Sequence, residues 1–386
     1  MREALRIAIL AHSTNPRGGV VHAVELGDAL CRLGHDAIVH APDTAGAGFF
    51  RKTTCRTASV PASRSPNDLT AMVETRIADY VRHFEHPQNR RFDVWHAQDG
   101  ISGNALATLK ARGLIGAFAR TVHHVDEFEH ARLTALQLRS ITAADRLFTV
   151  SELWRDWLAR EIGRDASHVG NGVDRRRFSP ARDAADSEVN ERLRLRPGAP
   201  VFLAVGGIEE RKNTIRVLEA FCLLRSREPS CRLVIAGGVS LLDHDAYQRR
   251  FAAALAKSGL PEDAVMRTGR WPQELMPALF RAATAMVFPS IREGFGLVVL
   301  EAMASGVPVV TSRIAPFTEY LDADDVIWCD PFDSASIATA MAASIEPSQR
   351  SRCVQRGFRV AADHDWVSTA RAHLPGYAKL TDLAYA

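Results

Sequence analysis

The chain has 386 residues, of which 46% are hydrophobic, and this is enough for a large buried core and for two domains. Its formal net charge of +3 excludes a strong general attraction to nucleic acid or to anionic lipid. The 6 cysteines form no C-x-x-C pair and no spacing typical of a metal site, so we expect reduced and partly buried thiols.

Short apolar runs in the first half of the chain predict buried strands. Longer helical patterns separate these runs, and this alternation is typical of parallel sheets that helices cover on both faces. The run nearest the N-terminus is too short for a signal peptide, so it is predicted to be the first strand. The predicted strands are residues 5–11, 36–42, 92–98, 119–124 and 146–151.

The segment N-P-R-G-G-V at residues 15–20 follows the first predicted strand and opens a helix. Gly18 and Gly19 would let the backbone approach a phosphate closely. The pattern is not G-x-G-x-x-G, so the dinucleotide-binding fingerprint is absent.

The segment T-V-H-H-V-D-E-F-E-H at residues 121–130 is dense in side chains that can bind metals. It lacks the H-E-x-x-H pattern, and no zinc-like spacing occurs elsewhere in the chain. We therefore favour a histidine at a strand end, placed to hydrogen-bond a substrate hydroxyl, over a metal site.

A polar stretch at residues 181–200 predicts a linker with room for one helix. It divides the chain into an N-terminal domain at residues 1–180 and a C-terminal domain at residues 201–365. The last segment, residues 366–386, is helical and modestly apolar. It could pack on either domain, and so back on the N-terminal one.

A second series of apolar runs follows the linker, again with helical patterns between them. Two such series predict an α/β protein with two doubly wound, Rossmann-like domains that face each other across a cleft. Ligands bind such sheets at the carboxyl ends of the strands, and an interdomain cleft is a favoured place for a small molecule. The second series of predicted strands is residues 201–207, 231–238, 264–270, 285–290 and 307–313.

Two adjacent cations, Arg211 and Lys212, follow the first strand of the second series, on a loop that leads into a helix. The planar donor fork of an arginine next to the point charge of a lysine can clamp a diphosphate. The alternative is a solvated helix start with local ion pairs to Glu209 and Glu210.

The stretch S-I-R-E-G-F-G-L-V-V-L-E-A-M-A-S-G at residues 290–306 follows a later strand of the same series. Its glycines allow a sharp turn, and a helix that begins near Leu297 would direct free N–H groups at an anion. Glu301, about one turn into that helix, could accept the hydroxyls of a ribose, while Glu293 would lie beside a sugar. The alternative for Glu301, an exposed helical glutamate, leaves Glu293 and the glycines unexplained.

The segment L-D-A-D-D at residues 321–325 contains an Asp-x-Asp triplet, which in other enzymes chelates a metal–diphosphate complex. Here it follows a helical pattern and precedes a strand pattern, so we expect a turn with acids at a helix end.

These motifs resemble the retaining glycosyltransferases of family 4, which have the two-domain GT-B fold. The resemblance covers nearly the whole chain and is most specific in the stretch E-G-F-G-L-V-V-L-E-A-M-A-S-G-V-P-V-V at residues 293–310. It also includes G-G-V at 18–20, T-V-H at 121–123, T-V-S at 149–151, N-G-V-D…F-S-P at 171–180, V-G-G-I-E-E-R-K-N at 205–213 and T-E-Y at 318–320.

The resemblance implies a hexosyltransferase that moves a sugar from a nucleotide-diphosphate sugar to an acceptor and retains the anomeric configuration. Arg211 and Lys212 would hold the diphosphate, Glu293 the sugar and Glu301 the ribose. His123 would lie near the sugar and the reacting centre, although His124 beside it leaves the choice of histidine open. Further donor contacts implied by the resemblance are Gly18, Gly19, Gly206, Arg270, Phe295, Gly296 and Leu297.

The same resemblance implies that no metal and no other cofactor is needed, because the two cations and the helix end neutralise the leaving diphosphate. The acceptor would attack from the leaving group's own face, without a covalent nucleophile from the protein. The chain departs from the family at Gly206-Gly207, where many members have Gly-Arg, so one donor contact is missing.

Two alternatives stay open, a glycoside phosphorylase or sugar-nucleotide epimerase of the same fold and a non-catalytic protein that binds nucleotide sugars. We expect a soluble cytoplasmic protein whose partners are a nucleotide sugar and an acceptor that the sequence does not identify. Weak peripheral contact of the N-terminal half with a membrane stays open, and the sequence does not fix the oligomeric state.

Overall fold

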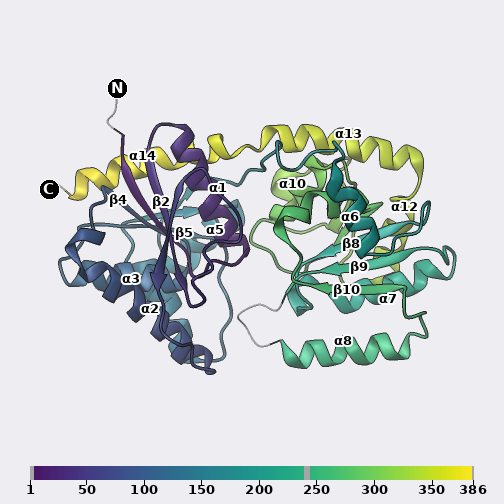
Figure 1. The fold of residues 1–386 in the computed structure, drawn as a ribbon, viewed down its shortest axis with the longest axis horizontal. Coiled ribbons are helices and arrows are strands. Elements are labelled where there is room, and N and C mark those ends of the chain that lie inside the picture. Colours follow the sequence, from purple (N-terminus) through teal and green to yellow (C-terminus); the bar gives the residue numbers. More distant parts are fainter. Residues whose placement is uncertain (1–3, 239–243, 385–386) are drawn as a thin grey trace. The chain divides into compact units, whose positions relative to one another are not determined.

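The computed structural model describes residues 4–238 and 244–384. The chain folds into two compact units, which we describe separately (Figure 1). The first unit comprises Met1–Gly172 together with Trp366–Ala386, and the second comprises Val173–Asp365.

The first unit is built on a sheet with the strand order β3-β2-β1-β4-β5-β6-β7, in which all neighbouring strands are parallel. The five strands predicted for this half are present, and β3 and β7 are additional. Both additional strands lie at edges of the sheet and are short or largely exposed, which explains why their sequences lack a continuous apolar run. The strands are β1 (Arg6–Leu10), β2 (Asp36–Asp43), β3 (Arg56–Pro61), β4 (Val94–Ala97), β5 (Ala119–Val122), β6 (Arg146–Thr149) and β7 (Ser167–His168).

Helices cover both faces of this first sheet. One face packs against α1 and the C-terminal helix α14, and the other packs against α2, α3 and α4. The helices are α1 (Gly18–Arg32), α2 (Leu69–Glu85), η1 (Pro87–Asn89), α3 (Gly100–Ala111), α4 (Ala131–Thr142), α5 (Glu152–Trp157), the π-helical turn η2 (Leu158–Ile162) and α14 (Trp366–Ala384).

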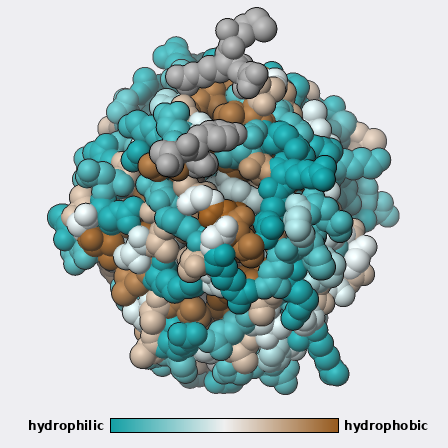
Figure 2. All heavy atoms as spheres, turned by 90° about the vertical axis from the view of Figure 1, so that its left-hand side faces the viewer, coloured by the Kyte–Doolittle hydropathy of each residue, from teal (hydrophilic) through white to brown (hydrophobic). Residues whose placement is uncertain are grey.

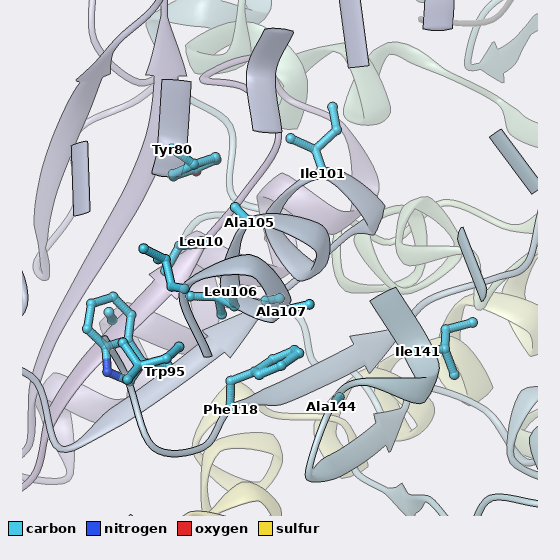
Figure 3. Close-up of a cluster of buried hydrophobic side chains, with 14 of the residues drawn as sticks. Leu10, Tyr80, Trp95, Ile101, Ala105, Leu106, Ala107, Phe118, Ile141 and Ala144 are labelled. Carbon is cyan, nitrogen blue, oxygen red and sulfur yellow. The ribbon is translucent and has the colours of Figure 1, made fainter. Parts of the chain in front are cut away.

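The core of the first unit lies between the sheet and the α2–α4 layer. Figure 3 shows Tyr80 from α2, Trp95 from β4 and Phe118, the residue before β5, gathered around small residues of α3. These aromatic side chains are almost fully buried, and a few large apolar groups of this kind supply much of the free energy of packing.

The second unit is built on a sheet with the order β10-β9-β8-β11-β12-β13, again parallel throughout. The five predicted strands of this half are present, and β13, only three residues long, is additional. The strands are β8 (Val201–Val205), β9 (Arg232–Ala236), β10 (Val265–Gly269), β11 (Ala285–Phe288), β12 (Val309–Ser312) and β13 (Ile327–Cys329).

Helices again form two layers on the second sheet. α7, α8 and α12 pack together on one side, and α6, α9, α10 and α13 pack together on the other. The helices are α6 (Ala184–Arg192), η3 (Glu210–Lys212), α7 (Thr214–Arg225), α8 (Asp245–Lys257), η4 (Gln273–Leu275), α9 (Met276–Ala282), α10 (Leu297–Ala304), α11 (Phe317–Tyr320), α12 (Ser334–Ala343) and α13 (Pro347–Asp363).

The division into units differs from the domain boundaries expected from the sequence. Residues 181–200, expected as a linker, lie inside the second unit, where α6 packs against α9. Asp186 of α6 accepts a hydrogen bond from Arg281 of α9 at 2.7 Å, which ties this polar stretch to the unit. The C-terminal helix α14 packs against α1 and against β4, β5 and β6 of the first unit.

Both sheets have the doubly wound strand order in which the direction of winding reverses once. The reversal falls between β1 and β4 in the first unit and between β8 and β11 in the second. The crevice outside the carboxyl ends of the strands at such a reversal is where open α/β sheets bind ligands. The loops after these four strands are therefore the expected positions of a ligand site.

Candidate active site

In the second unit, the loops after β8 and β11 are joined by hydrogen bonds. The amide of Asn213, at the end of η3, donates to the carbonyl oxygens of Pro289 at 3.1 Å and Pro331 at 2.6 Å. The backbone N–H of Ile291 donates to the carbonyl of Arg211 at 2.9 Å. These bonds fix the turn that carries Arg211 and Lys212 against the loop that carries Glu293.

Glu293 meets both cations at this reversal point. Its carboxylate forms an ion pair with the ammonium of Lys212, and it lies 3.5 Å from Nη1 of Arg211. It also accepts a hydrogen bond from the backbone N–H of Gly294 at 3.3 Å. Arg211 is shared, because its Nη2 lies 3.0 Å from Glu209. The structure thus brings together the two expected diphosphate ligands and the expected sugar ligand.

The ion pair is largely shielded from water, which alters its electrostatics. The side chains of Lys212 and Glu293 are each 12% exposed, and the Lys212 ammonium lies 4.2 Å from the centroid of the Phe288 ring. Burial lowers the pKa of Lys212 to about 8, although the charge of Glu293 opposes this change. Burial by itself would raise the pKa of Glu293, but Lys212 and Arg211 outweigh it and lower that pKa to about 2.

The helix start predicted near Leu297 is confirmed, because α10 begins at that residue. Gly296 precedes it with a φ of +93°, and a Cβ there would lie 2.6 Å from Cε1 of Phe317. Only glycine fits this position. Phe295 stacks on Tyr320 with ring centroids 4.6 Å apart, so its side chain supports the loop while its backbone leads into the helix.

Glycines also bring the carboxyl ends of β8, β9 and β10 close together. Gly206 donates to the carbonyl of Ala236 at 2.8 Å, and a Cβ on Gly237 would lie 2.2 Å from the carbonyl group of Gly206. A Cβ on Gly206 would lie 3.4 Å from Cε of Lys212, so this glycine borders the cation pair. The backbone of these glycines, which have no side chains, therefore lines the carboxyl edge of the sheet beside Lys212.

The departure from the family at Gly207 has a steric reason. A Cβ at this position would lie 2.7 Å from the carbonyl oxygen of Gly238 and 2.9 Å from Oε1 of Glu209. The local packing therefore does not accommodate the arginine that many members of the family carry here.

Two further expected donor contacts, Glu301 and Arg270, lie on other elements of the second unit. Glu301 is half-buried and lies about one turn into α10. Arg270 follows β10, is exposed, and has its Cβ 3.7 Å from the position that a Cβ on Gly238 would take. Arg270 thus lies directly after the carboxyl end of β10, and Glu301 lies in the helix that follows β11.

In the first unit, the start of α1 meets the residues that follow β4 and β5. A Cβ on Gly19 would lie 3.3 Å from Cδ2 of His123 and 3.8 Å from the carbonyl oxygen of Gln98. Gly18, in contrast, has open space where a side chain would be. The ring of His22 in α1 packs edge-on against His123, with centroids 4.8 Å apart. A side chain at position 19 would thus crowd His123, whereas the packing places no such restriction on position 18.

The two adjacent histidines face different surroundings. His123 is half-buried and packed against Gly19, whereas His124 is exposed and lies 3.3 Å from a carboxylate oxygen of Asp126. Burial holds the pKa of His123 well below its ordinary value, with the neighbouring His22 adding to the effect. His123 is therefore an uncharged group at the carboxyl edge of the sheet.

The remaining acidic and histidine-rich segments have structural contacts. His130 caps α4 by accepting from the backbone N–H of Arg132 at 3.3 Å. In the segment 321–325, Asp325 accepts from the backbone N–H of Asp322 at 2.8 Å and from Arg356 at 2.8 Å, which confirms a turn after α11. Within residues 4–238 and 244–384, no group of three or more His, Cys, Asp or Glu side chains is arranged to hold a metal ion.

Sequence reasoning missed two residues that shape these loops, Asn213 and Gln98. Asn213 has a φ of +62° and bonds to residues 76 and 118 positions away, which no local pattern reveals. Gln98 has a sequence signal, because it ends the predicted strand at residues 92–98 and so had to lie at the carboxyl edge.

All 6 cysteines are unpaired and buried or partly buried, as predicted. None of the helices in the described part of the chain is both long enough and apolar enough to cross a membrane. On the face seen in Figure 2, hydrophobic residues gather in several separate places among hydrophilic ones.

The structure thus has two Rossmann-like units, and the second carries a cation cluster at the reversal of its sheet, on the loops ahead of a helix start. Comparison with known proteins gives the class to which such a chain belongs. Residues 16–177 match the family described as Glycosyltransferase Family 4, and residues 186–360 match Glycosyl transferases group 1. The chain belongs to these group 1, family 4 glycosyltransferases.

Curated relatives agree with this assignment. A D-inositol 3-phosphate glycosyltransferase from Acidothermus cellulolyticus is 31% identical over 74% of this chain and 67% of that protein. A mannosylfructose-phosphate synthase from Agrobacterium fabrum is 28% identical over 61% of this chain, and the match spans about half, 52%, of that protein.

Solved structures show the same fold. A sucrose-phosphate synthase from Thermosynechococcus elongatus superposes with a TM-score of 0.80 and 21% identity, covering 98% of this chain and 99% of that one. Anabaena HepE in complex with UDP-glucose superposes with a TM-score of 0.79 and 17% identity, covering 97% and 100%. The predicted GT-B fold, with two Rossmann-like domains, is confirmed.

Proposed function

We propose that this glycosyltransferase moves a hexose from a nucleotide-diphosphate sugar to an acceptor, retains the anomeric configuration and needs no metal ion. The observation that carries the proposal is the cluster of Arg211, Lys212 and Glu293, fixed at the reversal point of the second sheet just ahead of α10. Two cations and the amino end of a helix are groups that attract an anion such as a diphosphate.

The cations would act on the leaving group. As the bond between the anomeric carbon and the phosphate oxygen breaks, negative charge grows on the diphosphate and positive charge on the sugar ring. Arg211 and Lys212 are already held in place, so they stabilise this charge separation without reorganising. Arg211, 40% exposed, is accessible to a ligand, while Lys212 lies deeper.

Donor binding would exchange partners within the cluster. The diphosphate would take the two cations from Glu293, and the freed carboxylate would accept hydrogen bonds from sugar hydroxyls. Glu301, one turn into α10, would accept the ribose hydroxyls, and the amides at Phe295, Gly296 and Leu297 would face the phosphate or sugar. Gly206 and Arg270 would complete the donor site of this unit.

The first unit would supply the groups around the reacting carbon. Gly19, with Gly18 beside it, would bring backbone close to the phosphate, and the neutral His123 would hydrogen-bond a sugar hydroxyl. The acceptor oxygen would attack on the face that the phosphate leaves, and its proton would pass to a phosphate oxygen. One C–O bond forms on the face where one breaks, which accounts for retention without a covalent enzyme intermediate.

The names of relatives suggest the chemical class of both substrates. HepE is described in complex with UDP-glucose, and the relatives named above act on inositol phosphate or form sugar phosphates. We propose a nucleotide-diphosphate hexose as donor and leave the acceptor open to polyols and sugar phosphates. Six unpaired cysteines support a cytoplasmic location.

The test begins with a thermal-shift screen of UDP, GDP and ADP sugars in the presence of EDTA. A ligand at 100 times its dissociation constant should stabilise its protein by about 2.7 kcal/mol. The donor found in this way is then incubated with a panel of polyols and sugar phosphates, and nucleotide release and the product anomer are followed by NMR. Acceptor-dependent release with a retained anomer supports the proposal.

Each alternative gives a different result in the same assay. Phosphate-dependent cleavage of a glycoside without nucleotide would indicate a phosphorylase, and a change in the sugar nucleotide without acceptor would indicate an epimerase. A thermal shift without any turnover across the panel would indicate a binding protein. An inverted product would contradict the proposed stereochemistry.

A further inference from the structure

The strands β4 and β5 are neighbours, and each ends in a polar residue that faces the other across the sheet edge. Gln98 follows β4 and is only 2% exposed, and His123 follows β5. The side-chain oxygen Oε1 of Gln98 lies 3.0 Å from Nε2 of His123. An amide buried next to the proposed substrate-facing histidine needs a reason, because an unpaired buried amide is costly.

The surroundings of Gln98 decide which way its amide points. Its nitrogen Nε2 lies 3.4 Å from both ring nitrogens of His96, so the NH2 group lies over the imidazole ring. The two nitrogens of His96 are already engaged, one with Tyr377 Oη and one with Thr121 Oγ1, each at 2.8 Å. An N–H group over a ring face is favourable, whereas a carbonyl oxygen there is not. The amide oxygen is therefore the atom that faces His123.

An amide oxygen can only accept a hydrogen bond, so Nε2 of His123 must carry the proton. We infer that Gln98 is a positioning residue that fixes His123 as the neutral Nε2–H tautomer and leaves Nδ1 as a hydrogen-bond acceptor at the sheet edge. Within the described residues, Nδ1 of His123 has no hydrogen-bond partner. The further step, that Nδ1 accepts from a substrate hydroxyl, rests on the proposed function.

The charged and titratable groups around His123 favour the neutral ring. Each of them is a cation or a potential cation, so each opposes a positive charge on His123. They come from α1, from β4, from β5 and from the residue that follows His123. These groups are His22, His96, Arg120 and His124. A neutral histidine with a fixed tautomer differs from one that switches protonation state, and this difference can be measured.

The tautomer is observable without any substrate. We would label the histidines of the full-length protein with 15N, record long-range proton–nitrogen correlations at pH 7.5 and assign His123 by its loss in His123→Asn. The expected result is a protonated, pyrrole-type Nε2 and an unprotonated, pyridine-type Nδ1. A pyrrole-type Nδ1 in the unmutated protein would overturn the inference, because the Gln98 amide would then have to be reversed.

Two variants test whether Gln98 sets this state. Gln98→Glu has the same shape but places a carboxylate beside Nε2, so the pKa of His123 should rise by at least one unit. Gln98→Leu removes the acceptor, so both tautomers should appear. The matched control is Gln137→Glu in the same unit, because among the described residues the amide of Gln137 bonds only to the backbone of Asp126, at 2.9 Å. A wild-type His123 signal in Gln98→Leu would also overturn the inference.

Kinetics with the donor and acceptor found above tests the link to the reaction. Gln98→Leu should lower kcat at least tenfold and change the KM of the donor less than threefold, since the histidine is misoriented but donor contacts in the second unit remain. Because Gln98 acts through His123, the double variant with His123→Ala should be no slower than His123→Ala alone. Additive losses would contradict a positioning role.

The two proposals fail separately in these experiments. If the tautomer is as expected but no glycosyl transfer is found, the inference about Gln98 holds and the proposed function is wrong. If transfer occurs with retention but Nδ1 of His123 carries the proton, the proposed function is supported and the positioning role of Gln98 is wrong. Equal thermal midpoints of the variants and the unmutated protein would show that folding is intact.

Discussion

The carboxylate of Glu293, on the loop after β11, forms an ion pair with the ammonium of Lys212, on the turn after β8. Arg211 lies 3.5 Å from the same carboxylate, so one acid bridges both cations. In this arrangement Glu293 supplies the negative charge that a donor diphosphate would bring. On the proposed function, donor binding would therefore replace one anion by another, and the following predictions test this proposal.

Arg211→Ala and Lys212→Ala should each weaken stabilisation of the diphosphate by about 1.5–3 kcal/mol, the range for hydrogen bonds to charged groups. This corresponds to a loss of roughly 10- to 150-fold in kcat/KM for the donor. Lys257→Ala, at the exposed end of α8 in the same unit, is the matched control and should change kcat/KM little. Unchanged turnover in both site variants would remove the assigned role.

The pH dependence of nucleotide-diphosphate binding should report on Lys212. Its pKa is lowered to about 8 by burial, so the ammonium loses its proton as the pH rises through 8, and affinity for an anion should fall. Calorimetric titration of the nucleotide diphosphate between pH 7 and 10 measures this loss. In Lys212→Arg the charge persists, so the decline above pH 8 should disappear. A decline of equal size in that variant would point to another group.

Glycine at position 296 should be required for both stability and binding. In Gly296→Ala, a residue with a φ of +93° gains a Cβ that would lie 2.6 Å from the Phe317 ring. The left-handed backbone alone costs about 1–2 kcal/mol, and the clash adds to it by displacing the start of α10. Gly34→Ala is the matched control, because φ there is +90° and no atom lies within 4 Å of the added Cβ.

The measurement for these glycine variants is hydrogen exchange of the α10 amides together with nucleotide-diphosphate affinity. Gly296→Ala should speed exchange in α10 and abolish detectable binding, whereas Gly34→Ala should leave both unchanged. Slow exchange in α10 with intact binding would mean that the loop tolerates the methyl group, and the amides of this turn would lose their place in the proposed site.

Acid should destabilise the first unit through its buried histidines. Burial lowers the pKa of His22 in α1 to about 4 and that of His373 in α14 to about 3, against 6.5 in the unfolded chain. Between these values the unfolded chain binds more protons, so stability is full above pH 6.5 and falls as the pH drops toward 4. The slope is roughly 1.4 kcal/mol per pH unit for each such histidine.

Hydrogen exchange of the α1 and α14 amides between pH 4.5 and 7 tests this, after correction for the intrinsic pH dependence of exchange. His373→Phe keeps an aromatic ring against Phe148. In this variant the free energy of unfolding should depend less steeply on pH, by the contribution of one histidine. The same slope with and without His373 would show that other groups control acid unfolding of this unit.

Most of the fold could be predicted from the sequence, because buried parallel strands are apolar over their whole length. All ten predicted strands are present, and the helix start at Leu297 was visible as a glycine followed by an apolar helical run. The strands that were not predicted, β3, β7 and β13, are edge strands that are short or largely exposed, so burial leaves little trace in their sequences.

The contacts between the site residues were less predictable from the sequence than the identity of these residues. Arg211, Lys212 and Glu293 were predictable as site residues because each follows a strand, but their ion pairs join residues about eighty positions apart. Gln98 and Tyr377, which meet at His96, are further apart still, and α14 brings the tyrosine back to the first sheet. Such contacts depend on tertiary packing and not on any local pattern.

Removal of divalent metal should leave glycosyl transfer intact. The proposed donor site has two cations on a loop and a helix that begins four residues after Glu293, and their positive charge would do what a metal otherwise does. The test compares initial rates in EDTA with rates after addition of Mg²⁺ or Mn²⁺, at constant ionic strength because ions also screen the cations. Rates within a factor of two are expected. A complete loss in EDTA that Mn²⁺ restores would overturn the metal-independent mechanism and return attention to the acids at residues 321–325 and the histidine-rich segment 121–130.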